Sequence, residues 1–347
     1  MQLGFNVIGA FMTNWDLTNE TGHCMADHDR EDARFVCDKL NIPFNEVNFV
    51  KEYWNDVFSQ FLQGYENGAT PNPDVLCNKY IKFGYFFDYA TQQLGGDAVA
   101  TGHYARNSAG TFLEHVNEVE DVQLLRSVDR VKDQTLFLAQ ISQHSLRRTM
   151  FPVGDLVKSV VKEMALTADL EKIVKKKEYL PPAPGDFIDV ETGNVVGKHK
   201  GVHYWTVGQR ANIGGLHKAY FIADCRPHTR QVIVAQGTNH PALFAQSMTT
   251  DRPHWIHRKP AQLSPQSDNE CLFKFQHAHD LSHCCIHEMD TGHLQVTLEQ
   301  PLRALTAGQY AVFYDGEQCL GSACIQRPGS SLYHLGLAED DKLQHTS

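Results

Sequence analysis

The sequence predicts three parts in order: an α/β domain with a doubly wound parallel sheet, a small central domain of helices and strands, and a C-terminal β-barrel. Strand-like apolar runs alternate with helical runs as far as residue 101, and a Pro-rich run at 181–185 reads as a domain junction. Beyond the junction, short strand-like runs follow one another with turn residues roughly every 8–12 positions. The predicted parts are 1–150, 151–240, 241–330 and a frayed tail at 331–347.

The α/β domain is predicted from its alternating pattern. Its expected elements are strands at 5–12, 43–50 and 97–101, helices at 27–40 and 51–66, and a helix that carries Cys77 and ends at Gly95-Gly96. In doubly wound sheets, ligands bind at the carboxyl ends of the strands. Met12 and Gly102-His103 are therefore expected on the ligand side.

The C-terminal half is predicted to form one or two small β-barrels. The strand-like runs that predict them are FIDV (187–190), NVVGKH (194–199), YFIADC (220–225), QVIVAQG (231–237), CLFKFQH (271–277), LQVTLE (294–299), QYAVFYDG (309–316) and CLGSACI (319–325). The vicinal pair Cys284-Cys285 is expected to alternate between the two faces of a further strand, with one thiol buried.

The segment Thr70–Lys79 (TPNPDVLCNK) is the strongest local signal. Asn72 is a good N-cap and Pro73 a good first helical residue, so a helix is expected to begin here. Cys77 then shares a face with Asp74, three residues earlier. A thiol held over a bound substrate is one interpretation, and a buried structural cysteine is the other.

Charge is unevenly distributed along the chain. The net charge is −10 overall, and it divides into −11 for residues 1–125, +5 for 126–218 and −4 for 219–347. The overall value argues against indiscriminate binding of polyanions, while the basic middle segment is a candidate polyanion-binding surface or a solvated lysine face.

The cysteine pattern suits a reducing compartment. Nine cysteines show no C-x-x-C pair, and no Cys and His positions form the two close pairs of a zinc site, so no metal site is predicted. No apolar run is long enough for a membrane span, and the first residues show neither a signal peptide nor a transit peptide.

Several blocks resemble the tRNA-specific 2-thiouridylases, in order and over most of the chain. They are FMTNWD (11–16), TPNPDVLCNKYIKF (70–83), ATGHY (100–104), KDQTLFL (132–138), FPVG (151–154), YLPPAPG (179–185), GQRANIGGL (208–216), HPAL (240–243) and GQYAVFYDGEQCLG (308–321). The GQRANIGGL form is more similar to the mitochondrial branch. The resemblance implies an N-terminal domain of the adenine nucleotide hydrolase type and ATP- and Mg²⁺-dependent exchange of sulfur for the C2 oxygen of the wobble uridine U34.

The resemblance also implies a mechanism. ATP adenylates the uridine O2, a cysteine persulfide delivers sulfur, and a second cysteine resolves the resulting disulfide bond. The partners would be the anticodon stem-loop of a tRNA and a persulfide sulfur-donor protein, with no membrane association. The compartment would be the mitochondrion, with the cytoplasm as the alternative.

Residue roles are implied only where this sequence matches the family motifs. Cys77 matches the catalytic nucleophile and Asp74 a catalytic position, and Asn72, Pro73 and Asp74 match the segment that contacts the target base. The other matches are Met12 and Gly102 for ATP, and His103, Lys132, Asp133, Gln134, Gln276, His277 and Gln309 for tRNA. At 276 the usual arginine is a glutamine, which predicts a weaker contact. On the Cys77 helix, Asp74 disfavours a thiolate, and Lys79 and Lys82 are expected to offset it.

Two family segments have no match in this sequence. One is the Ser-Gly-Gly-x-Asp-Ser pyrophosphate loop with its strand, and the other lies between Glu178 and Tyr179 and would carry the persulfide cysteine. An alternative transcript or an incomplete gene model is our expected cause. We therefore expect a catalytically incomplete chain, with no shared neighbour between the strands 5–12 and 98–101, and poor solubility.

Two other functions stay open at this point. An inactive tRNA-binding relative or truncated isoform would keep the basic middle segment and the barrels. A different ATP-pyrophosphatase enzyme, such as an amidotransferase, is disfavoured by the block around Cys77 and by the β-rich C-terminal half.

Overall fold

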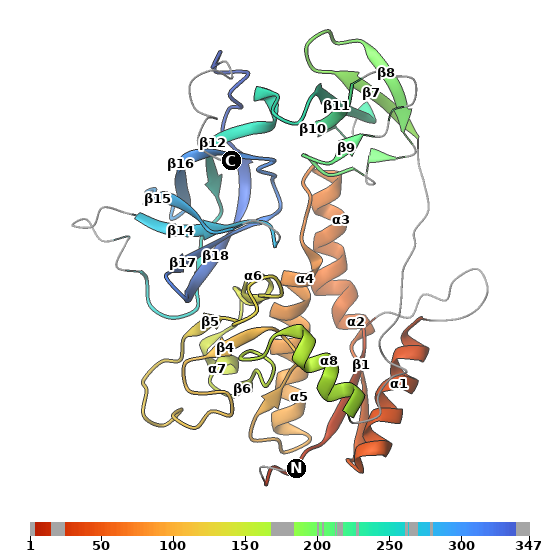
Figure 1. Cartoon of the computed structure of the whole chain (residues 1–347), viewed down its shortest axis with the longest axis vertical. Helices are drawn as coiled ribbons and strands as arrows, with labels where there is room; N and C mark the ends of the chain where they lie inside the picture. The colour runs from red at the N-terminus through yellow and green to blue at the C-terminus, as the bar shows by residue number, and fades with distance from the viewer. Residues whose placement is uncertain are drawn as a thin grey trace.

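The computed structural model describes residues 4–14, 25–167, 184–199, 201–202, 205–211, 213, 218–226, 229–260, 263, 270–277 and 280–337. The basic stretch 172–177, the junction at 178–179, most of the Pro-rich run and the last ten residues lie outside this part, so our predictions for them have no structural counterpart. Figure 1 shows three units: the α/β domain below, the C-terminal barrel at upper left and the central sheet at upper right.

The α/β domain begins with a parallel strand pair and its crossover helix. Strand β1 (Gly9–Thr13) pairs with β2 (Phe44–Asn48), and helix α1 (Met25–Leu40) connects them. The helix packs closely at its C-terminal end, where a Cβ on Gly9 would lie 2.4 Å from Cys37 Sγ. These elements agree with the predicted strand–helix–strand order.

Two long helical segments follow, and each contains a π-helical stretch. The first comprises α2 (Val50–Tyr53), the π-helix η1 (Trp54–Phe58) and α3 (Ser59–Glu66), and the second comprises α4 (Pro73–Leu76), the π-helix η2 (Cys77–Tyr85) and α5 (Phe86–Gln92). The second segment runs along the middle of the molecule in Figure 1. The sequence pattern predicted both helices but gave no sign of their π-helical winding.

The parallel sheet of this domain is divided into two pairs. Strand β3 (Val99–Ala100) pairs in parallel with β6 (Thr149–Met150), and among the described residues neither strand is bonded to β1 or β2. Within the described ranges, the first and third predicted strands therefore belong to separate strand pairs. The helical connections are α6 (Thr135–Leu138), α7 (Gln143–Leu146) and the later α8 (Lys158–Thr167).

The central domain is a mixed sheet in the order β8-β7-β11-β10-β9. Its strands are β7 (Gly185–Asp189), β8 (Val195–His199), β9 (Arg210–Ala211), β10 (Tyr220–Arg226) and β11 (Gln231–Gln236). Its small core is centred on Phe187 and Ile222. Its sheet content matches the prediction.

The C-terminal domain is a closed barrel, because β12 pairs with both β16 and β18. Its described strands are β12 (Phe244–Thr250), β14 (Glu270–Lys274), β15 (Ser282–Glu288), β16 (Leu294–Arg303), β17 (Tyr310–Asp315) and β18 (Gln318–Pro328), with the short 3-10 helix η6 (Pro241–Leu243) before them and β13 (His254–Trp255) against β18. Strand β15 carries Cys284 buried and Cys285 exposed, as predicted.

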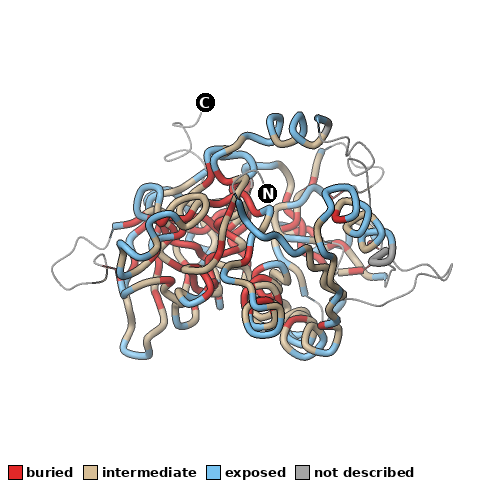
Figure 2. Tube along the Cα trace, turned by 90° about the horizontal axis from the view of Figure 1, so that it is seen from below, coloured by how far each residue is buried: buried red, intermediate tan, exposed pale blue. Residues whose placement is uncertain are grey.

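The barrel sheet extends into the α/β domain. Strand β5 (Leu124–Arg126) pairs with β18, and β4 (Ala105–Asn107) pairs with β5. The largest described core cluster consequently contains residues of both units, including Leu124, Leu138 and Tyr314. Figure 2 shows the buried segments in red in the interior, with exposed segments in pale blue around them.

Candidate functional site

The helix that carries Cys77 starts as the sequence predicts. Asn72 is its N-cap, and its side-chain oxygen accepts a hydrogen bond from the backbone N–H of Asp74 at 3.2 Å, with Pro73 as the first helical residue. The cap fixes the loop that leads into the helix. Cys77 follows one turn later, at the point where the α-helical winding changes to π-helical winding.

The π-helical winding changes which residues share a face with Cys77. In an α-helix of 3.6 residues per turn, residues five apart lie about 140° apart around the axis. In a π-helix the hydrogen bonds run between residues five apart, which brings both to about the same face. Lys82 is five residues after Cys77 within η2, so the winding brings the two residues to about the same face of the helix.

The Cys77 thiol is partly buried at one end of the α/β domain. It packs against a cluster around Phe49 and Leu76 that also includes Met12 and Tyr53. Burial raises the pKa of the Cys77 thiol, Lys82 opposes this, and Asp74 adds to it. The sulfur is therefore neither sealed in the interior nor freely exposed.

His103 follows strand β3 and is buried as a neutral imidazole. Its Nδ1 lies 2.8 Å from Thr101 Oγ1, and its Nε2 lies 3.5 Å from Lys82 Nζ. Burial, and then the Lys82 charge, lower the pKa of His103 to about 3. The ring also packs against Phe83 of the Cys77 helix, with ring centroids 5.9 Å apart.

Met12 and Gly102 lie on or directly after two different strands of the α/β domain. Met12 is on β1, packed on the Cys77 cluster, and Gly102 follows β3, next to His103. No heavy atom lies within 4 Å of a Cβ built on Gly102, so a ligand can approach this backbone closely. The contacts of Met12 and Gly102 with ATP stay a prediction.

Two residues of the barrel form hydrogen bonds with the loop before the Cys77 helix. The backbone N–H of Thr70 donates to Ala307 O at 2.8 Å, and Gln309 Nε2 donates to Thr70 O at 2.6 Å. Gly308, between them, approaches so closely that a Cβ there would lie 2.9 Å from the Thr70 carbonyl carbon. Gln309, expected from the resemblance to contact tRNA, thus also holds the loop in place.

The three residues of the Lys132-Asp133-Gln134 run have different environments. Lys132 is exposed, whereas Asp133 is buried and receives hydrogen bonds from Arg126, Ser127 and Thr135. Gln134 accepts a hydrogen bond from Tyr104 N at 2.9 Å. Only Lys132 presents an unburied charge, and the tRNA contact of the run stays a prediction.

Gln276 and His277 belong to the barrel, but they lie beside the segment that contains Asp133 and Phe137. The His277 ring stacks on Phe137 with centroids 5.5 Å apart, and it has a hydrogen bond to the backbone of Asp133. Phe137 O in turn accepts a hydrogen bond from Asn78 Nδ2 at 2.9 Å, next to Cys77. The fold therefore brings both predicted tRNA-contacting runs to the neighbourhood of the Cys77 helix.

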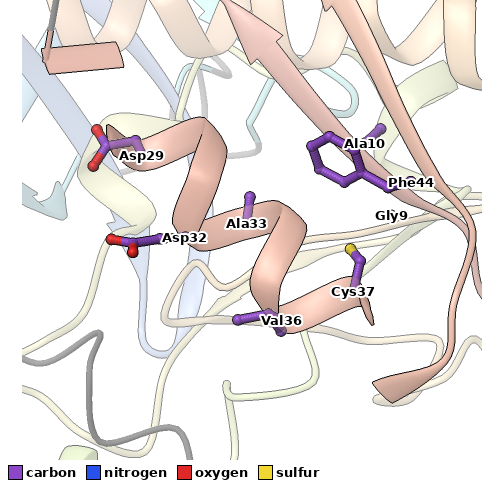
Figure 3. A pocket seen from close by; sticks show the side chains of 8 residues that line it. All are labelled: Gly9, Ala10, Asp29, Asp32, Ala33, Val36, Cys37 and Phe44. Atoms are coloured by element: carbon purple, nitrogen blue, oxygen red, sulfur yellow. The ribbon is translucent and has the colours of Figure 1, made fainter. Parts of the chain in front are cut away.

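A cavity of about 430 Å³ lies elsewhere in the α/β domain, between α1 and the strands β1 and β2. Figure 3 shows Asp29 and Asp32 on the helix at left and Phe44 beside the strands at right. None of its lining residues belongs to the predicted site. Among the described residues, no cluster of three or more His, Cys, Asp or Glu side chains could hold a metal ion.

Two residues that contact His103 were not predicted as site residues. Thr101 has a short polar side chain at a strand end, which carries no signal of its own, and Lys82 was grouped with Lys79 as an offsetting charge. The structure separates the two lysines, because Lys79 Nζ points to the barrel side and donates to Gln140 Oε1 at 3.0 Å. The π-helical winding sets the different positions of Lys79 and Lys82 around the helix, and the sequence pattern did not reveal this winding.

Comparison with known families and proteins gives one consistent result. Three family models match: the tRNA methyl transferase HUP domain over residues 1–180, the tRNA methyl transferase PRC-barrel domain over 176–236 and the aminomethyltransferase beta-barrel domain over 245–325. No helix in the described part of the chain is both long and apolar enough to cross a bilayer.

Similar curated proteins come from animals and bacteria. Mitochondrial tRNA-specific 2-thiouridylase 1 of Homo sapiens is 46% identical over 366 residues (96% of this chain and 87% of the relative), and that of Gallus gallus is 44% identical over 374 residues (96% and 88%). The tRNA-specific 2-thiouridylase MnmA of Levilactobacillus brevis is 41% identical over 349 residues (93% and 89%). The first two aligned stretches are longer than this chain, so those relatives have residues with no counterpart here.

Proposed function

Because this chain belongs to the tRNA-specific 2-thiouridylase family, we propose that it binds the anticodon region of a tRNA and presents Cys77 to C2 of the wobble uridine. One observation carries the proposal. The Cys77 thiol and the Asn72-Pro73-Asp74 loop lie on one helix, His103 is linked to that helix through Lys82, and the barrel residue Gln309 holds the preceding loop at Thr70. The target base would have to leave its stack to reach the thiol.

The residues of the chain supply positioning and charge for this reaction. The capped loop at Asn72 would hold the base, and Met12 with the open backbone at Gly102 would receive the adenosine part of ATP. ATP, when bound, would supply the adenylyl group that activates the uridine O2, with Mg²⁺ as the expected counter-ion. Cys77 must act as a thiolate, which burial opposes and the Lys82 charge favours.

The tRNA-binding surface is proposed to span two units. Lys132 of the α/β domain and Gln276 and His277 of the barrel lie near the Cys77 helix. Exposed lysines of the basic middle segment would contact phosphates without reading sequence. His103 and Gln309 would contribute from the edge of the site, in addition to their contacts within the protein.

We further propose that this chain alone does not complete sulfur transfer. No cysteine lies between Cys77 and Cys225 in the sequence. The Cys225 thiol is partly buried, lies 3.5 Å from Trp205 O, and burial raises its pKa to about 12. It is unsuited to carry a persulfide, so the cysteine that does so would come from a longer form of the chain. The sulfur donor would be a separate persulfide protein, and the compartment the mitochondrion.

Binding and chemistry are tested separately. Filter binding of tRNA, with a steep fall in affinity as salt rises, is expected for this chain. ATP–pyrophosphate exchange stimulated by tRNA, and formation of 2-thiouridine, are expected only from a form that also contains the two unmatched segments. Absence of tRNA binding at low salt would refute the proposed function, and turnover by this chain alone would refute its incompleteness.

A further inference from the structure

Three polar side chains connect the end of strand β3 with Lys82 on the Cys77 helix. Thr101 Oγ1 lies 2.8 Å from His103 Nδ1, and His103 Nε2 lies 3.5 Å from Lys82 Nζ. The π-helical winding of η2 places Lys82 on the face of Cys77. The residues after β3 and the helix η2 thus meet at the Lys82 ammonium, whose charge opposes the rise in the pKa of the Cys77 thiol.

The direction of these hydrogen bonds follows from the chemistry of the groups. A lysine ammonium can only donate, so His103 Nε2 must be the acceptor and the ring proton must be on Nδ1. Nδ1–H then donates to Thr101 Oγ1. The imidazole can accept from the lysine only while it is neutral, and its burial keeps it neutral at physiological pH.

We propose that Thr101 and His103 are positioning residues that hold the Lys82 ammonium against the Cys77 thiol. This assignment deepens the proposed function, on which it rests, by naming the cation that stabilises the nucleophile. It also gives His103 a role that does not depend on tRNA. Lys79, on the same helix, does not take part, because its ammonium is bonded to Gln140.

Other groups around the thiol act against the lysine. Asp74 on the same helix disfavours a thiolate, and Tyr53 of α2 packs on the same cluster as a neutral phenol. Met12 of β1 contributes only apolar surface. Lys82 is the one basic group among the causes that shift the Cys77 pKa, and removal of its charge would leave burial and Asp74 unopposed.

The test is the pH profile of Cys77 alkylation in the full chain. Iodoacetamide is the probe, and mass spectrometry of the peptide that contains Cys77 separates it from the other cysteines. Lys82→Met is expected to raise the midpoint of the profile by about one pH unit. The alkylation rate of Cys77 at pH 8 is then expected to fall about three-fold. The thiolate fraction falls about ten-fold, but a thiolate of higher pKa is more nucleophilic, which offsets part of that loss.

Three further variants identify the cause. Lys82→Arg keeps the charge and is expected to stay closer to the wild type than Lys82→Met. Thr101→Val removes the acceptor for the Nδ1 proton, so the imidazole can carry its proton on Nε2, where it repels the Lys82 ammonium. This variant is expected to raise the midpoint of the alkylation profile, by less than Lys82→Met does. Lys79→Met is the matched control on the same helix, and its profile is expected to coincide with the wild type.

Several results would overturn the proposal. Equal profiles for Lys82→Met and Lys79→Met would do so, as would a Lys82→Arg profile no closer to the wild type than that of Lys82→Met. If circular dichroism shows Lys82→Met to be unfolded, an unchanged profile for folded Thr101→Val overturns it instead. Binding of tRNA by the wild-type chain is measured in parallel. Failure of the wild-type chain to bind tRNA would count against the proposed function without altering the alkylation result.

Discussion

The C-terminal barrel and the α/β domain differ in how completely their sheets are paired. The barrel closes on itself through β12 and β18, and side chains such as Phe273 and Phe313 are fully buried inside it. In the α/β domain the sheet is divided into two pairs, and β1 has no fully buried residue. The residues just before β1 are about 40% exposed, namely Phe5, Val7 and Ile8. The barrel therefore provides most of the rigidity near the site, although the thiol belongs to the other domain.

The contacts between the two regions show the same asymmetry. The loop before the Cys77 helix is held by Ala307 and Gln309, and β5 is an added strand on the barrel sheet. The α/β domain is thus braced from the barrel side and open at its β1 edge. The predictions below compare the two regions, from the largest expected effect to the smallest.

Truncation of a core side chain should distinguish the regions most clearly. Phe313→Ala is expected to lower the free energy of unfolding of the barrel by about 3–5 kcal/mol, because the side chain is fully buried against Trp255 and its loss leaves a cavity. Ile8→Ala, at a position 40% exposed, is expected to cost less than about 1 kcal/mol. Urea unfolding followed by hydrogen exchange measures both, and similar losses would contradict the comparison.

Acid should destabilise the α/β domain through His103. The pKa of His103 is about 3 in the folded protein and near its ordinary value of 6.5 in the unfolded chain, so only the unfolded chain takes up a proton as the pH falls below 6.5. The free energy of unfolding should drop by about 2 kcal/mol between pH 7 and pH 5 from this group. His103→Gln should remove that part of the pH dependence. An unchanged slope in the variant would show that His103 titrates normally.

Substitution at Gly308 tests the brace between the barrel and the loop. Gly308→Ala places a Cβ 2.9 Å from the Thr70 carbonyl carbon at φ +88°, and is expected to cost about 1–3 kcal/mol and to speed alkylation of Cys77 by loosening the loop. Gly237→Ala is the matched control, with the same φ of +88° and open space around the Cβ. Equal effects would mean that backbone strain alone is responsible.

The smallest expected effect concerns a single phosphate contact. Lys132→Ala is expected to reduce the slope of log affinity for tRNA against log salt concentration by about 1, with no change in stability. Lys39→Ala on helix α1, distant in sequence from the predicted tRNA-contacting runs, serves as the control. Filter binding over a salt series measures the slopes, and two identical slopes would remove Lys132 from the binding surface.

Local signals in the sequence predicted a large part of this structure. The Asn72-Pro73 cap, the alternation in the barrel strands and the opposite faces of Cys284 and Cys285 all follow from contacts between near neighbours in the chain. The separation of the β1 pair from the β3 pair was also predicted, because the element expected between them has no match in the sequence.

The remainder could not be predicted, because it depends on tertiary packing. No local pattern distinguishes a π-helix from an α-helix at Cys77–Tyr85, so the difference between Lys79 and Lys82 was invisible. The burial of Asp133 depends on Arg126 and Thr135 reaching it in the fold, and the hydrogen bond of Gln309 joins residues 239 positions apart. The segment 111–118 is a series of turns, and β4 and β5 pair on either side of it.

The hydrogen bond between Gln309 and Thr70 has a consequence for biosynthesis. The ribosome synthesises Thr70 long before Ala307 and Gln309. The loop before the Cys77 helix therefore lacks these two hydrogen-bond partners while most of the polypeptide is being made. Closure of such a distant pair is a late step, since its loop entropy must be offset by contacts that form earlier. The Cys77 helix therefore gains this anchor only late in translation, once Ala307 and Gln309 have been synthesised.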